Sequence, residues 1–333
     1  MKSLSVFLLI CLASATYAQS DSSDPQLQNH LRRSQEAASA NKYDEAFKEL
    51  KEANKEKNNR CDVCYLQMAL LYSKAGDIQR MLESAQKALG VASSDGMRAE
   101  AHALQGQALA HFAASDPKKL QAAEQEFHTA IQLNSQAPLY HLNLGILLLK
   151  QSHDEEGSHE LSQYVTLAPD GPYAETARKM IANPRRAREN YAPEFQFTTL
   201  QGESLSLDAL AGKTVVLDFW ATWCHPCRDS VPDLKELQKK YSPGQLELIS
   251  ISADEDEKQW RDFIAKQQMN WPQFWDRAGD IRSAFGVHSF PTYIVINEEG
   301  VITQRIVGEN PQQSVAARLK SVLASLPKLN SKN

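Results

Sequence analysis

The residues best suited to chemistry in this chain are two pairs of cysteines, with two residues between the members of each pair. The pairs are Cys61 with Cys64 and Cys224 with Cys227. The second pair follows a strand-like apolar run, Val215 to Trp220, and precedes a segment with helical spacing. A cysteine at the mouth of such a helix lies over unpaired backbone N–H groups, which favour its thiolate form. The pattern predicts thiol–disulfide exchange, with Cys224 as the attacking thiolate and Cys227 as the resolving thiol.

Three residues beside this pair are expected to tune its reactivity. Pro226 falls in the first turn of the expected helix, where its missing N–H costs no hydrogen bond. A protonated His225 would stabilise a nearby thiolate and make the couple more oxidising, whereas a solvent-exposed His225 would have little effect. Asp218 is a carboxylate in a strand otherwise fit for a core. Burial would raise its pKa and let it relay protons, unless its role is purely structural.

The segment from Leu217 to Cys227 resembles the active-site stretch of thioredoxin. Asp218 stands where that family carries its buried carboxylate, and Pro232 where the family kinks its helix. Phe290-Pro291-Thr292 resembles the segment with the cis-proline. The resemblance extends to the TlpA-like branch of exported thiol–disulfide oxidoreductases and covers about residues 192–328. It implies an α/β fold with a central mixed sheet flanked by helices.

The resemblance also implies roles for individual residues. Asp218 would deprotonate Cys227 during exchange, and a cis Pro291 would pack against the disulfide. Trp220 and Trp223 would shield the disulfide and form a flat docking surface, or would serve as core packing alone. The residues expected to contact substrate are Trp220, Trp223, Phe290 and Thr292. The implied redox group is the Cys224–Cys227 disulfide itself, with no further cofactor.

The start of the chain is typical of a secretory signal peptide over residues 1–18. Lys2 precedes an apolar run from Leu4 to Ala13, and small residues follow at Thr16-Tyr17-Ala18. The run is well short of the roughly 20 apolar residues of a membrane span. The bulky Ile10 before Cys11 fits a lipoprotein signal poorly. We therefore expect secretion across the inner membrane and a soluble periplasmic protein.

Length and charge limit the remaining possibilities. A chain of 333 residues is long enough for about two domains. The formal net charge of −5 argues against a nucleic-acid surface. A basic segment at 184–188, framed by prolines, marks a boundary between the domains, and we expect a linker over 183–191.

Residues 20–182 are rich in Ala, Leu, Gln, Glu and Lys and predict an all-helical region. A pattern of small, large and small residues recurs at intervals near the roughly 34 residues of the tetratricopeptide repeat. Its positions are Ala46, Leu50, Ala53, then Met81, Ala85, Ala88, then Ala123, Phe127, Ala130, and finally Gly157, Leu161, Tyr164. The region resembles a tetratricopeptide solenoid that presents a surface to a peptide or partner protein. An ordinary helical bundle is the alternative.

The first cysteine pair lies inside this helical region. Cys61 and Cys64 lack the preceding strand, the aromatic neighbours and the cis-proline of the second pair. In an exported protein they predict a local structural disulfide. A second redox pair and a metal site are the alternatives. No metal is expected, because no recognisable ligand spacing connects His102, His111 and His128.

An acidic run, Asp254-Glu255-Asp256, is expected to start a helix near Trp260. A calcium site there would need the glycine and the final glutamate of an EF-hand loop, which the run lacks. Residues 254–285 are expected to form the helical insertion of the TlpA-like branch.

Together these features favour an exported thiol–disulfide oxidoreductase of the reductase or isomerase type. Its partners would be client proteins, a membrane or periplasmic electron-transfer protein, and an unknown peptide or protein on the helical array, with no nucleic acid. A peroxiredoxin-like peroxidase would need a threonine where Ala221 stands and would not need Cys227. A non-enzymatic scaffold with a thioredoxin-fold binding module would be expected to lose one cysteine or the cis-proline.

Overall fold

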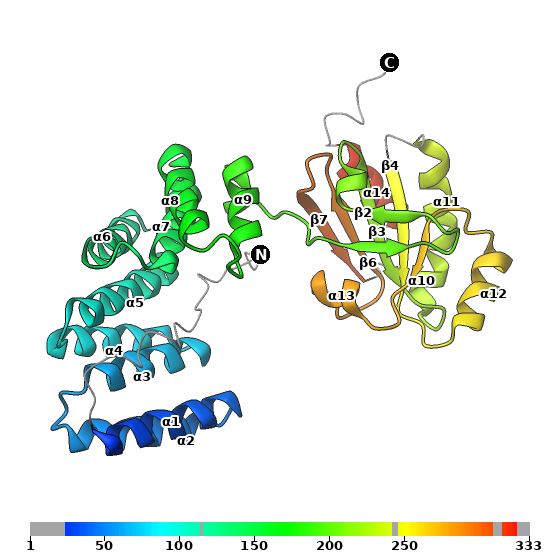
Figure 1. Cartoon of the computed structure of the whole chain (residues 1–333). Coiled ribbons are helices and arrows are strands. Elements are labelled where there is room, and N and C mark those ends of the chain that lie inside the picture. Colours follow the sequence, from blue (N-terminus) through cyan, green and yellow to red (C-terminus); the bar gives the residue numbers. More distant parts are fainter. Residues whose placement is uncertain (1–23, 114–115, 242–245, 309–314, 325–333) are drawn as a thin grey trace. The chain divides into compact units, whose positions relative to one another are not determined.

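The computed structural model describes residues 24–113, 116–241, 246–308 and 315–324. The chain divides into two units, Met1–Arg188 and Glu189–Asn333 (Figure 1). The expected signal peptide, residues 1–18, lies outside the described residues. Among the described helices, none combines the length and the apolar character that a membrane span requires.

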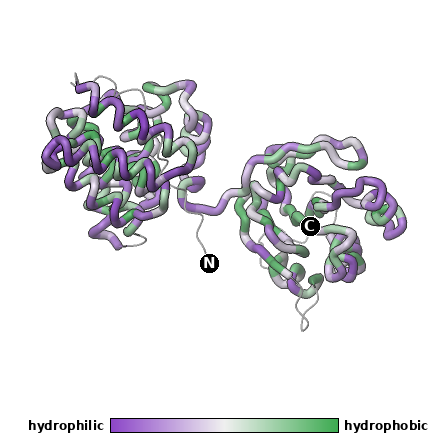
Figure 2. The backbone as a smooth tube through the Cα atoms, turned by 90° about the horizontal axis from the view of Figure 1, so that it is seen from below, coloured by the Kyte–Doolittle hydropathy of each residue, from purple (hydrophilic) through white to green (hydrophobic). Residues whose placement is uncertain are grey.

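The first unit is built of helices that follow one another as antiparallel hairpins (Figure 1). Its helices are α1 (Pro25–Ser39), α2 (Tyr43–Glu56), α3 (Asp62–Lys74), α4 (Ile78–Val91), α5 (Asp95–Ala113), α6 (Pro117–Leu133), α7 (Pro138–Lys150), α8 (Asp154–Leu167) and α9 (Ala174–Ala182). The prediction of an N-terminal helical repeat region is confirmed for residues 25–182. Figure 2 shows hydrophilic and hydrophobic positions alternating along these helices. The second helices of the hairpins, α2, α4, α6 and α8, each bury one face, whereas α3 and α7 are buried on nearly all sides.

The predicted repeat positions lie on the second helix of each hairpin, α2, α4, α6 and α8, and all of them are buried. Two glycines show why small residues recur in this pattern. A Cβ at Gly145 would lie 2.8 Å from a side-chain atom of Leu161, and one at Gly157 would lie 2.6 Å from Leu149. The backbones of α7 and α8 approach so closely that no larger residue fits without a shift.

A histidine–glutamate contact joins the two helices of three hairpins. His30 Nδ1 lies 2.7 Å from Glu49, and His141 Nδ1 lies 2.7 Å from Glu160. The third contact, between α5 and α6, joins His102 to Glu126 at 2.6 Å. The hydrogen bond to Glu160 raises the pKa of His141. These histidines therefore hold helix pairs together, and no group of described residues has a metal-binding arrangement.

The start of the expected linker over 183–191 is folded. Pro184–Ala187 forms a 3₁₀-helix, η2, and Ala187 is buried in the same core cluster as α7, α8 and α9 residues. The Arg188 guanidinium donates to the backbone carbonyl of Leu149 at 2.9 Å and pairs with Asp154. Arg188 thus has partners within the helical unit, which a solvated linker would not provide.

The second unit contains a two-stranded hairpin and a five-stranded mixed sheet. The hairpin strands are β1 (Gln196–Thr198) and β2 (Ser204–Ser206). The sheet strands are β3 (Thr214–Trp220), β4 (Leu246–Ser252), β5 (Gln273–Trp275), β6 (Thr292–Ile296) and β7 (Ile302–Val307). Their order is β5-β4-β3-β6-β7; β3, β4 and β5 are parallel, and β6 and β7 run antiparallel to their neighbours.

The helices of this unit are η3 (Asp208–Leu210), α10 (His225–Asp229), α11 (Val231–Lys240), α12 (Glu257–Gln267), α13 (Asp280–Ala284) and α14 (Val315–Ala324). The mixed sheet flanked by helices confirms the expected thioredoxin-like fold. The segment 254–285, expected as a helical insertion, also carries β5. That short strand extends the sheet because it pairs with β4 from Ser250 to Ser252.

The central strand β3 is buried along its whole length, and its alternate residues face two cores. Val216 and Trp220 pack with apolar residues of α10, α11, α12 and α14. Val215, Leu217 and Phe219 face the opposite side, which the β1–β2 hairpin and the residues after α13 cover. Since side chains alternate along a strand, Asp218 shares the face of Val216 and Trp220. That face is the one beneath α10.

Candidate active site

Cys224 and Cys227 are joined by a disulfide at the start of α10, with their Cα atoms 5.3 Å apart. Cys224 is the N-cap of this helix, and its sulfur accepts a hydrogen bond from the backbone N–H of Cys227 at 3.3 Å. An N–H aimed at the sulfur stabilises negative charge on it once the disulfide is reduced. Pro226 lies in the first turn, as expected. The predicted pair therefore has the geometry of a reactive thiolate with a resolving partner one turn later.

The active-site helix is interrupted after α10 and resumes as α11. Pro232 lies in the first turn of α11, which begins directly after Ser230. The Ser230 hydroxyl donates to the Pro226 carbonyl at 2.9 Å and so bridges the interruption.

Asp218 is 2 % exposed, and among the described residues no cation lies beside it to offset its burial. Burial raises the pKa of Asp218 to about 7, and a hydrogen bond from Ser250 acts in the opposite direction. A carboxyl group with this pKa can take up and release protons near neutral pH. Asp218 lies on the sheet face that packs beneath Cys227, as its expected role requires.

The partners of Asp218 were not predicted from the sequence. Ser250 lies opposite Asp218 in the parallel β3–β4 register, and its hydroxyl is 2.7 Å from Asp218 Oδ2. The indole N–H of Trp271 donates to the same hydroxyl at 2.8 Å. On the other side, Tyr293 of β6 lies opposite Asp218. Burial raises the pKa of Tyr293 well above its usual value, so its phenol stays neutral.

A second buried carboxylate holds the loop that leads to Cys224. Asp254 accepts the backbone N–H of Thr222 at 3.0 Å, the Thr222 hydroxyl at 2.7 Å and the Ser252 hydroxyl at 2.7 Å. The residue that starts the expected helix is Asp256. Its side chain caps α12 by accepting the backbone N–H groups of Lys258 and Gln259. The acidic run thus both holds the loop before Cys224, through Asp254, and starts α12, through Asp256. Only the helix start was predicted from the sequence.

The surface beside the disulfide is aromatic. Trp223 is 62 % exposed, and its ring meets that of Phe290 edge to face, with centroids 5.8 Å apart. The peptide bond between Phe290 and Pro291 is cis, as expected. Trp220 and Thr292, expected to contact substrate, are each only 1 % exposed. They belong to the core because they lie on buried strands. Of the four residues expected to contact substrate, Trp223 is exposed and Phe290 is partly exposed.

His225 points into solvent, with 75 % of its side chain exposed. Its Nδ1 lies 3.4 Å from a carboxylate oxygen of Asp229, one helical turn later. This arrangement matches the alternative in which His225 is solvent-exposed and has little effect on the thiolate, because the ring lies beside a carboxylate and is screened by water.

Comparisons with known proteins agree with this site. A family model described as Redoxin matches residues 187–323. The thiol-disulfide oxidoreductase ResA of Bacillus thuringiensis is 34% identical over 131 residues, which cover 39% of this chain and 76% of the relative. The thioredoxin-like protein YneN of Bacillus subtilis is 38% identical, covering 38% of this chain and 76% of YneN. The chain belongs to the redoxin family.

A solved structure of a putative thiol:disulfide interchange protein DsbE from Chlorobium tepidum is also similar. It is 29% identical, and the match covers 42% of this chain and 97% of that protein, with a TM-score of 0.39. The family match and the site together make this redoxin a thiol–disulfide oxidoreductase with a thioredoxin fold. The redoxin match begins at residue 187 and leaves α1 to α9 outside it.

The helical unit of this redoxin carries the other cysteine pair. Cys61 and Cys64 form a disulfide with Cα atoms 5.2 Å apart, and both are buried. Cys61 is the N-cap of α3, and its sulfur accepts the N–H of Cys64 at 3.2 Å. Asn54 of α2 accepts the backbone N–H of Cys61. The pair fastens the α2–α3 turn to the start of α3, in keeping with a structural role.

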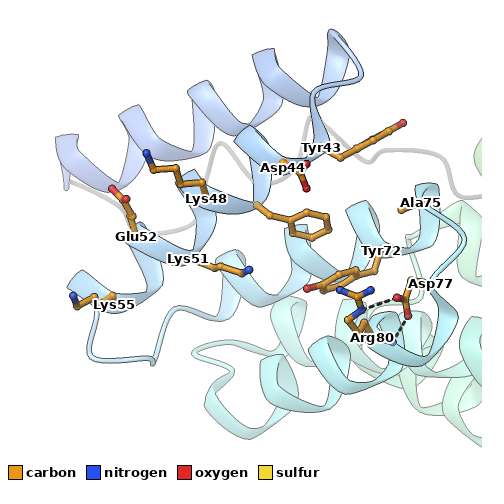
Figure 3. A pocket seen from close by; sticks show the side chains of 11 residues that line it. Tyr43, Asp44, Lys48, Lys51, Glu52, Lys55, Tyr72, Ala75, Asp77 and Arg80 are labelled. Carbon is orange, nitrogen blue, oxygen red and sulfur yellow. Dashed lines mark hydrogen bonds and ion pairs between the residues drawn. The ribbon is translucent and has the colours of Figure 1, made fainter.

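The helical unit also contains a groove between α2, α3 and α4, with a volume of ≈ 610 Å³ (Figure 3). Within this groove the ring centroids of Phe47 and Tyr72 lie 4.3 Å apart. The Arg80 guanidinium stands 5.0 Å from the centre of the Tyr72 ring and pairs with Asp77. The lysines that line the groove, all from α2, are Lys48, Lys51 and Lys55.

Proposed function

We propose that this chain is an exported protein-disulfide reductase or isomerase that exchanges disulfides with client proteins through Cys224 and Cys227. The observation that carries the proposal is the position of Cys224. The Cys224 sulfur accepts the backbone N–H of Cys227, and the residue directly before Cys224 is the exposed Trp223. A thiolate beside an exposed aromatic surface suits a protein substrate better than a small one.

The reaction follows from this geometry. The Cys224 thiolate attacks a client disulfide, a Cys224–client bond forms, and one client sulfur leaves as a thiolate. Cys227 then gives its proton to the Asp218 carboxylate and attacks the Cys224 sulfur. The Cys224–client bond breaks and the second client sulfur leaves. Two electrons have moved from the cysteine pair to the client, and the Cys224–Cys227 disulfide of the structure is the oxidised product.

The reduction potential of the Cys224–Cys227 pair tests this proposal. Equilibration against glutathione buffers should give a single two-electron transition that persists in the Cys61→Ala/Cys64→Ala variant. A potential near −270 mV, roughly that of thioredoxin, would indicate a reductase that a membrane or periplasmic donor must supply with electrons. A potential near −120 mV would indicate an oxidase instead. A pair that does not titrate would contradict the proposal.

We also propose that the helical unit is a tetratricopeptide array that docks a peptide or partner protein, and we place the docking in the groove of Figure 3. The adjacent rings of Phe47 and Tyr72, tilted by 31° to each other, offer an apolar platform, and the lysines of α2 add positive charge. Aromatic residues next to cations are typical of protein-binding sites.

Replacement of Tyr72 by Ala should reduce docking without changing catalysis at Cys224. We expect the variant to reduce insulin at the unchanged rate. When Cys227→Ser is added to trap clients as mixed disulfides, the Tyr72→Ala chain should trap fewer client proteins than the chain with Tyr72. Tyr65→Ala on the same helix is the matched control, because Tyr65 does not line the groove. An identical set of trapped clients in the Tyr72 and Tyr65 variants would refute docking at this groove.

Export is supported by the signal-like residues 1–18 and by the Cys61–Cys64 disulfide, a bond that persists in oxidising compartments. In a bacterium the destination would be the periplasm. Tracking the mature N-terminus of the protein in a cell fraction tests this point, because cleavage after Ala18 would leave Gln19 as the first residue.

A further inference from the structure

Three buried side chains form a line of hydrogen bonds that ends at the proposed proton acceptor. The indole N–H of Trp271 donates to Ser250 Oγ at 2.8 Å, and Ser250 Oγ donates to Asp218 Oδ2 at 2.7 Å. Trp271 and Asp218 are each 2 % exposed and Ser250 is fully buried. Water therefore has little access to these groups. Their hydrogen bonds to one another, together with burial, set the protonation of the Asp218 carboxyl group.

The chemistry of the three side chains determines which group donates and which accepts each hydrogen bond. An indole nitrogen can only donate, so Ser250 must accept from Trp271. The single hydrogen of the Ser250 hydroxyl is then free to point at Asp218. Two donors in series, ending at a carboxylate, stabilise its charged form and oppose the burial that favours the neutral form.

Within the described part of the chain, Asp218 has no other hydrogen-bond donor, since its Oδ1 is buried without a partner. Asp218 shares the β3 face of Val216 and Trp220, whose cluster contains Cys227 of α10, and Tyr293 of β6 lies opposite Asp218 in the sheet. Ser230, Asp233 of α11 and Arg318 of α14 act on Tyr293 rather than directly on Asp218: Ser230 through a hydrogen bond, the other two through their charges. Ser250 is thus the one described group that favours ionisation of Asp218.

We propose that Ser250, oriented by Trp271, is a positioning residue that keeps Asp218 ionised so that it can accept the proton of Cys227. This inference rests on the proposed function, because it concerns the step in which Cys227 resolves the mixed disulfide. No described cation neutralises Asp218, so the serine hydroxyl and the indole take the place of a charge partner.

Replacement of Ser250 by Ala should move the pH dependence of the resolving step. The rate of that step rises with pH as Asp218 ionises. Loss of a hydrogen bond to a charged group corresponds to a shift of the midpoint to higher pH by roughly one to two units. The variant should therefore be about 10-fold or more slower at pH 6, and equal to the parent well above both midpoints. A carbon-13 NMR titration of the Asp218 carboxyl group should show the same shift.

Three variants make the experiment specific. Trp271→Phe should move the midpoint in the same direction by a smaller amount. In the Ser250→Ala background it should add no further shift, because Trp271 acts through Ser250. Ser252→Ala is the matched control: Ser252 is a buried serine on the same strand, but its hydroxyl is bonded to Asp254. It should leave the midpoint of Asp218 unchanged.

An unchanged midpoint in Ser250→Ala, or an equal shift in Ser252→Ala, would overturn the inference. An additional shift from Trp271→Phe in the Ser250→Ala background would also overturn it. The NMR titration does not need a client protein. It therefore separates this inference from the proposed function, which fails if the Cys224–Cys227 pair reduces no disulfide at any pH.

Discussion

The Cys227→Ser variant should accumulate a stable mixed disulfide between Cys224 and its client. A serine hydroxyl has a far higher pKa than a thiol and cannot displace the client from Cys224 by forming a disulfide. The first attack still proceeds, because the helix N–H that stabilises the Cys224 thiolate is a backbone group and survives the substitution. We expect turnover of insulin reduction to fall by roughly 10⁴-fold, the scale of removing an essential catalytic group.

Non-reducing electrophoresis against reduced insulin standards would display the trapped species. The Cys224→Ser variant is the control, since it lacks the attacking thiolate and should trap nothing. Both variants are best made in the Cys61→Ala/Cys64→Ala background as well, to keep the first pair from resolving the intermediate. Rapid turnover by Cys227→Ser in that background would mean that a group other than Cys227 resolves the mixed disulfide.

The Phe127→Ala variant should destabilise the helical unit by about 3–5 kcal/mol. Phe127 is completely buried, and its ring lies against the backbone of α5 at Gly106, where an added Cβ would stand 3.0 Å from it. Truncation leaves a cavity that rigid neighbouring helices cannot fill. In a repeat array, where stability is shared between neighbouring units, this loss should weaken α5 and α6 first.

Urea unfolding followed by circular dichroism at 222 nm would measure this loss of unfolding free energy. Because the chain has two units, the transition of the helical unit has to be fitted separately. Phe112→Ala on α5 is the control, since its ring is only half-buried. Insulin reduction at moderate temperature should be unchanged in both variants. An equally large loss of stability in Phe112→Ala would show that burial against Gly106 is not the cause.

The sequence was most informative where a feature is local. The strand before Cys224, the proline-kinked helix after Cys227 and the repeated small residues of α2, α4, α6 and α8 all depend on neighbours a few residues apart. Each of them is placed in the structure as its spacing predicted. Trp220 and Thr292, two of the residues expected to contact substrate, are buried in the structure, and for Trp220 core packing was the alternative. Both lie on strands whose burial depends on segments far away in the chain.

The residues that sequence reasoning missed come together only through strand register. Ser250 meets Asp218 because β3 and β4 pair in parallel, and Trp271 reaches the same hydroxyl from the segment before β5. Asp254 meets Thr222 across a separation of 32 residues. A polar residue inside an apolar strand was the available signal: Ser250 and Ser252 alternate with isoleucines in β4, as Asp218 interrupts β3.

The histidines of the helical unit could have been found by their spacing. His30 and Glu49 are 19 residues apart, and so are His141 and Glu160. The same separation in the first and fourth hairpins is a second trace of the repeat. The third pair escapes this pattern because α5 and α6 are longer helices, which widens its separation to 24 residues.

The Thr222–Asp254 anchor has a consequence for the way clients are selected. A loop tied to a buried carboxylate through both the backbone N–H and the hydroxyl of Thr222 is already in its final conformation, so little conformational entropy is lost on its side when a client docks on Trp223. Under the proposed function the adjustment would come from the client, whose chain would extend across Trp223 and Phe290 to bring its sulfur to Cys224. Clients with a locally unfolded segment around the disulfide would then react fastest, and the enzyme would distinguish unfinished proteins from folded ones through their flexibility.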